Sequence, residues 1–174
     1  MIDADKQAIE KTASYSSTAA QRASGGLERK VIREIVEAIN PVIADGFALY
    51  EKTKNFSLNA AGSDKLLLDE QAREIFASMD ALAEQLRQSG AAPLRSISHS
   101  GELLSIENYN GDILSPDEMI AELINDNRQI AASLRAAGRI CEKMSEATLG
   151  IILQDVLGKT ERRIRILVFS SGRQ

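Results

Sequence analysis

The fold is decided most clearly by residues 64–89, which read DKLLLDEQAREIFASMDALAEQLRQS. Apolar residues recur in this stretch at steps of three and four, with charged residues between them, and this spacing predicts one long amphipathic helix. Gly90 and Pro93 mark its end, and Ser63 stands where an N-cap residue is expected. The apolar stripe consists of Leu68, Ala72, Ile75, Met79, Leu82, Ala83 and Leu86.

The preceding part of the chain divides in two. Residues 27–56 carry apolar residues at helical spacing straight through Pro41, so we expect one helix there, kinked or loosened at the proline. Residues 1–26 are rich in Ala, Ser, Thr and Gln, and their three basic and three acidic residues cancel. We therefore expect a mobile arm over residues 1–26, a helical domain over 27–170 and a short tail over 171–174.

The sequence pattern after residue 90 predicts a long connection followed by two more helices. Residues 91–114 contain turn signals and a possible short helix around 101–106. This connection is too long for a tight hairpin. Ser115 then begins a helix, because Glu118 three residues later completes a capping box. A last helix runs from about residue 145 to 168. Four helices with one long crossover between the second and third match the ferritin-like variant of the four-helix bundle, an all-α fold.

The composition excludes several classes of protein. The chain has 174 residues, 44% of them hydrophobic and 26% charged, which suits one globular domain, and it has no apolar run long enough for a membrane span. A single cysteine, Cys141, excludes an internal disulfide, and a single histidine, His99, excludes metal sites with two histidines. The sequence begins without a secretion signal and contains no glycine-rich phosphate loop. We expect a cytoplasmic protein with no organic cofactor and no membrane partner.

Charged residues line one side of the helix over residues 64–89. On a wheel with about 100° per residue, setting Asp69 at 0° places Asp80 near +20° and Glu84 near +60°. Carboxylates at this spacing can supply oxygen ligands to Fe(II), Mn(II) or Mg(II). The same pattern also fits a solvated face with ordinary ion pairs, such as Asp69 with Arg73. Spacing alone leaves both interpretations open.

Several short segments match one family pattern. They read FALYEKTKNF at 47–56, LLLDEQA at 66–72, DALAE at 80–84, LRSI at 94–97, MIAEL at 119–123, DN at 126–127 and ERR at 161–163. Together they resemble the Dps family of small ferritins, over roughly residues 27–170 and in register with the four helices. The resemblance implies a subunit of a hollow dodecamer, in which Fe(II) is oxidised, preferably by hydrogen peroxide, and ferric mineral is stored. It also implies protection of DNA, which is frequent in the family.

The resemblance departs from the family at the iron-binding residues. Ser57 stands where the family has its first iron-binding histidine, and Lys65 stands where it has the second. The carboxylates of the family's dinuclear site correspond to Asp69, Asp80 and Glu84. A lysine ammonium offers a metal no lone pair. We therefore expect iron to bind loosely at these carboxylates, with Lys65 taking the place of iron at the subunit interface and oxidation impaired.

Two further sets of residues carry predictions. Glu142 and Glu146, near the start of the last helix, are expected to line an acidic pore for cations, which the resembled family has in this region. The chain has a net charge of −4, but its C-terminal end is basic. Arg162, Arg163 and Arg165 at that end are expected either to bind DNA phosphates or to form interface and solvent pairs.

The sequence leaves two functions open. The first is a ferritin-like shell of identical subunits that stores iron and protects against stress, with impaired ferroxidase activity. The second is a structural or DNA-binding shell of the same fold with no iron chemistry, as loss of both histidines suggests. Whether the chain is an enzyme depends on which alternative holds.

Overall fold

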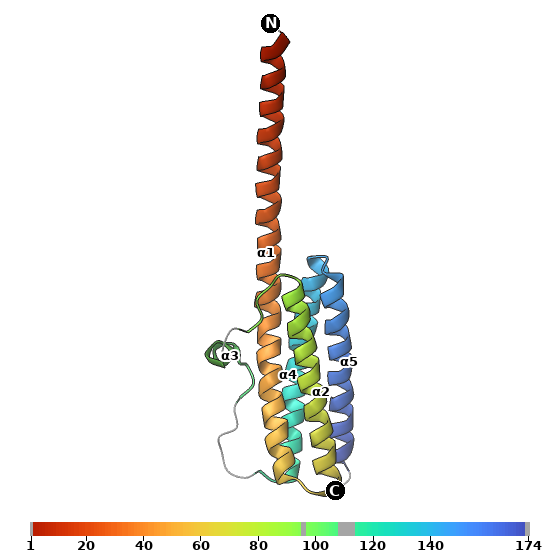
Figure 1. Cartoon of the computed structure of the whole chain (residues 1–174). Helices are drawn as coiled ribbons and strands as arrows, with labels where there is room; N and C mark the ends of the chain where they lie inside the picture. Colours follow the sequence, from red (N-terminus) through yellow and green to blue (C-terminus); the bar gives the residue numbers. More distant parts are fainter. Residues whose placement is uncertain (1, 95–96, 108–113, 173–174) are drawn as a thin grey trace.

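A four-helix bundle makes up the fold in the computed structural model (Figure 1). The structure describes the backbone of residues 2–94, 97–107 and 114–172, and the side chains of residues 28–94, 100–107 and 114–172. Its helices are α1 (Ile2–Asn59), α2 (Gly62–Gln88), α3 (Ile97–Leu103), α4 (Pro116–Lys143) and α5 (Ala147–Ser171). The predicted all-α bundle with a short helix in its long crossover is confirmed, although that helix begins at Ile97 and ends at Leu103.

The four long helices pack in a closed square. α1 lies against α2 and α4, and α5 lies against α4 and α2, so each helix has two neighbours. α3 contacts α1 from outside the bundle (Figure 1). None of the described helices is both long and apolar enough to cross a membrane.

The starts of α2 and α4 test the N-cap residues that the sequence predicts. Ser115 Oγ accepts a hydrogen bond from the Glu118 backbone N–H, and the Glu118 carboxylate accepts one from the Ser115 backbone N–H at 2.8 Å. The predicted capping box is therefore confirmed. Ser63 is not the N-cap of α2, since the cap residue is Ala61. Gly62 has a φ of 57°, which an L side chain disfavours, and it turns the chain before Ser63.

α1 is much longer than the sequence pattern indicates. Its backbone is helical from Ile2, so the predicted start at Leu27 is wrong, and the helix projects far beyond one end of the bundle (Figure 1). Alanine, glutamine, lysine and glutamate in the first residues all favour helix, which explains the extension. The helix also continues through Pro41, as expected. That residues 1–26 act as an arm separate from the bundle stays a prediction.

Apolar side chains from all four long helices form one core. Ile39, Leu82, Leu123 and Leu149 are fully buried, and burial of a side chain of this size stabilises a fold by about 1.5–3 kcal/mol. The core also contains charged and polar side chains, which are unusual at such depth. The most notable of these are Lys52, Asp126, Asn127, Thr160 and Arg163.

Candidate functional site

Asp69 lies where the end of α1 meets the start of α2. Lys54 Nζ lies 2.5 Å from Asp69 Oδ1, and the Ser57 hydroxyl donates a hydrogen bond to the same oxygen at 2.9 Å. Lys65 Nζ lies 3.5 Å from Asp69 Oδ2. Two ammonium groups and one hydroxyl thus surround the carboxylate, which is 23% exposed. We call Lys54, Ser57, Lys65 and Asp69 the Asp69 cluster.

The charge balance of the Asp69 cluster is positive. Lys54 and then Ser57 stabilise the charged carboxylate, and this lowers the pKa of Asp69 to about 2. Asp69 is therefore ionised at neutral pH, and two positive charges against one negative leave a net charge of +1. A cation that approached Asp69 would meet two ammonium groups first.

Short connections position Ser57 and Lys65, the two residues that the resemblance matches to the family's histidines. Ser57 is fully buried in the last turns of α1, and the chain turns into α2 only a few residues later. Lys65 Nζ donates a hydrogen bond to the Ser57 carbonyl oxygen at 3.3 Å. Lys65 therefore binds a free carbonyl at the C-terminal end of α1 as well as Asp69, and a cation is favourable at this end of a helix.

The other two predicted carboxylates lie apart from Asp69. Asp80 and Glu84 are exposed on α2, and eleven residues of helix separate Asp80 from Asp69 by about 17 Å along the axis. Glu84 accepts hydrogen bonds from Arg87 Nη2 at 2.7 Å and Arg87 Nε at 2.8 Å. Arg87, with Gln88, lowers the pKa of Glu84 to about 2. One chain therefore does not bring the three carboxylates together.

A single subunit does not offer a complete iron site. Over residues 28–94, 100–107 and 114–172, no three side chains of His, Cys, Asp or Glu gather closely enough to hold a metal ion. The side chain of His99 lies outside the described residues. Iron needs oxygen or imidazole donors with free lone pairs, and Lys54 and Lys65 occupy both oxygens of Asp69. The described residues of one chain thus do not fit a dinuclear iron site.

The predicted pore residues lie together at the turn between α4 and α5. Glu142 and Glu146 line one cavity of about 810 Å³, and Arg139 and Cys141 also border it. Cys141 is buried, and burial raises the pKa of its thiol. Acidic and basic side chains thus share this cavity, and its role in a pore stays a prediction.

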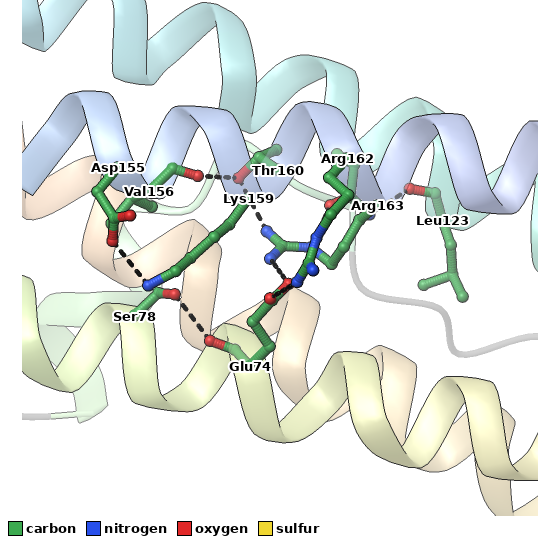
Figure 2. Close-up of polar contacts among 10 residues, drawn as sticks. Glu74, Ser78, Leu123, Asp155, Val156, Lys159, Thr160, Arg162 and Arg163 are labelled. Atoms are coloured by element: carbon green, nitrogen blue, oxygen red, sulfur yellow. Dashed lines mark hydrogen bonds and ion pairs between the residues drawn. The ribbon is translucent and has the colours of Figure 1, made fainter.

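The three predicted DNA-binding arginines have different surroundings. Arg163 is 2% exposed, and its guanidinium donates to Thr160 Oγ1 at 2.8 Å (Figure 2). It also donates to Asn127 Oδ1 at 3.1 Å. Its Nη1 also lies 2.9 Å from Glu74 Oε2. Its donors are therefore used inside the bundle and are turned away from an external phosphate.

Arg162 and Arg165 are the accessible members of that set. Arg162 is exposed and pairs from α5 with Glu74 on α2 (Figure 2). Arg165 is exposed on α5. DNA binding through these two residues stays a prediction.

A buried ion cluster between α1 and α4 was missed by the sequence analysis. Lys52 Nζ lies 2.7 Å from Asp126 Oδ2 and 3.2 Å from Glu122 Oε2. A signal for it was present, because Asp126 falls in the apolar stripe of α4 between Leu123 and Ile130. A charged residue at a core position indicates a buried partner.

Comparison with known proteins decides the family. A family model described as a ferritin-like domain matches residues 36–168. The chain belongs to the ferritin-like family. Among curated relatives, the DNA protection during starvation protein of Brevibacillus brevis is 25% identical over 141 residues, which cover 78% of this chain and 94% of that protein. A low temperature-induced protein of Nostoc is 28% identical over 114 residues, and the match covers 63% of this chain and 64% of that protein.

Solved structures of ferritin-like proteins share the fold. The archaeal Dps homologue from Halobacterium salinarum superposes with a TM-score of 0.77 at 19% identity, covering 83% of each chain. Dps from Thermosynechococcus elongatus gives a TM-score of 0.75 at 17% identity, covering 81% of this chain and 92% of that one. These matches show that the chain, a member of the ferritin-like family, has the same fold as these Dps structures.

Proposed function

We propose that this protein forms a Dps-like shell of identical subunits, twelve as the family resemblance implies, that stores iron and protects the cytoplasm under stress. We further propose that its oxidation of Fe(II) by peroxide is impaired. Membership of the ferritin-like family and similarity to a DNA protection during starvation protein support the first statement. The Asp69 cluster supports the second.

The pairing of Asp69 is the observation that carries the proposal. Fe(II) is the substrate here, and it must bind donors with free lone pairs before peroxide can oxidise it. Asp69 instead holds Lys54 at 2.5 Å and Lys65 at 3.5 Å. To bind Asp69, iron must displace an ammonium group from a carboxylate whose pKa is about 2, and positions 57 and 65 hold no histidine that could replace it.

Asp80 and Glu84 are exposed and can reach a neighbouring subunit. Both are exposed on α2, as is Phe76, a large apolar side chain that is 47% exposed. In the proposed shell, these acids of one subunit face the positively charged Asp69 cluster of the next. The lysines of the Asp69 cluster would then neutralise Asp80 and Glu84 at the subunit contact in place of iron. Such an ion pair would keep the acids compensated but would not oxidise Fe(II).

A shell without iron chemistry is the second candidate. The absence of histidine at Ser57 and Lys65 favours it, and the exposed Arg162 and Arg165 provide cations for DNA phosphates. Binding through phosphates weakens steeply as salt increases. A gel shift that is lost between low and moderate salt would support this candidate, while no shift at low salt would contradict the DNA role.

Stopped-flow oxidation of Fe(II) by hydrogen peroxide tests the main proposal. The wild-type protein is compared with an Asp80→Asn/Glu84→Gln variant and with a protein-free control. We expect slow oxidation in all three, with iron retained by the wild-type shell. Fast oxidation by the wild type that the variant loses would show that the carboxylates alone sustain a ferroxidase, and the proposal of impairment would be wrong.

A further inference from the structure

The α1–α4 seam contains a charged cluster that the proposed function does not use. Lys52 on α1 contacts two acids on α4, Glu122 and Asp126, which lie one helical turn apart. The side chains of Lys52 and Asp126 are only 6% and 4% exposed, while Glu122 is 44% exposed at the rim. The cluster therefore extends from the bundle interior to its surface.

The two acids require a cation at this position. Acids four residues apart on one helix repel each other, and burial of an unpaired carboxylate is costly. The buried Asp126 Oδ2 lies 2.7 Å from Lys52 Nζ, and this ion pair compensates its charge. Asp45 on α1 is also buried nearby, but Ser105 and Ile106 donate to its carboxylate.

We propose that Glu122 and Asp126 form a cation site in the bundle that the ammonium group of Lys52 occupies. Two carboxylates that converge on one point are also ligands for a hard divalent cation. Ferritin-like carboxylate proteins hold metal ions between facing helices of the bundle. Lys52 thus excludes metal from the α1–α4 seam, and iron taken up by the shell is confined to sites outside it.

Removal of Lys52 should convert the cluster into a metal site. Lys52→Ala opens space beside the acids, whereas Lys52→Met removes the charge and keeps the space filled. We expect equilibrium dialysis with Mn²⁺ to show about one more bound ion per chain in Lys52→Ala than in the wild type, as one carboxylate pair provides one site. Lys52→Met and Lys52→Ala/Asp126→Asn should lack this ion. An equal uptake by folded Lys52→Ala and wild type, or extra uptake that survives Asp126→Asn, would overturn the proposal.

If Lys52→Ala does not fold, the stabilities of the Lys52→Met variants and the wild type test the proposal instead. Lys52→Met should be less stable than the wild type at pH 7, and adding Asp126→Asn should restore much of the loss because no buried charge is left. Burial raises the pKa of Asp126 above its ordinary value, so its ionised form opposes folding and its protonated form does not. The difference between Lys52→Met and wild type should therefore shrink as pH falls. If Asp126→Asn restores nothing, Lys52 acts through packing and the proposal is wrong. Neither readout uses iron oxidation, so this test is independent of the proposed function.

Discussion

Replacement of Arg163 should destabilise the bundle far more than replacement of its neighbour Arg162. Both arginines pair with Glu74 (Figure 2), but Arg163 is 2% exposed and Arg162 is 57% exposed. Arg163→Ala removes a buried cation, leaves Asn127 Oδ1 without its donor and opens a cavity beside Thr160. Breaking a buried pair by removing one partner costs about 3–5 kcal/mol. An exposed pair contributes about 0–1 kcal/mol, so Arg162→Ala is a matched control on the same helix.

Thermal unfolding of the two variants at pH 7 measures this difference. For a chain of this size, each kcal/mol shifts Tm by about 2–4 °C, so Arg163→Ala should lower Tm by about 6–20 °C. Arg162→Ala should lower Tm by at most about 4 °C on the same scale. Equal stabilities of the two variants would refute the inference that Arg163 supports the core.

Three further predictions concern packing, capping and the cysteine. Gly46→Ala should destabilise the protein by about 1–3 kcal/mol in chemical unfolding, because the added Cβ would lie 2.0 Å from Met79 Sδ; a fully stable variant would contradict the close contact. Ser115→Ala should cost about 0.5–2 kcal/mol through loss of the two hydrogen bonds between the Ser115 hydroxyl and Glu118, and an unchanged unfolding midpoint would argue against the capping box. Cys141 should react with a thiol reagent only as fast as the protein opens, because burial shields the thiol and raises its pKa; immediate labelling of the native protein would disprove its burial.

The fold was predictable because local signals agree with the tertiary structure. The apolar spacing in residues 64–89 and the capping box at Ser115 depend on neighbouring residues only, and both appear as expected. The start of α1 was wrong because the Ser-Gly-Gly run reads as a boundary although the surrounding residues favour helix. Local signals therefore predict which segments are helical more accurately than they predict the residue at which a helix starts.

The candidate site was predictable only where its residues share one helix. Lys65 and Asp69 are four residues apart on α2, so their contact follows from helical spacing. Lys54 reaches Asp69 from α1, and no spacing rule links residues on two helices. For the same reason the sequence did not reveal that Arg163 points inward to Asn127 on α4, because that contact depends on how α5 rotates against its neighbours.

Introducing histidines at the two positions proposed to lack them provides the most direct test of the central claim. A Lys54→Ala/Ser57→His/Lys65→His variant frees Asp69 from both ammonium groups and supplies two imidazoles. The measurement is the initial rate of Fe(II) oxidation by hydrogen peroxide, with the wild type and a protein-free sample alongside. The account predicts that the wild type is close to the protein-free rate and that the variant is clearly faster than both. A wild type that already oxidises Fe(II) well above the protein-free rate, with no gain in the variant, would contradict it.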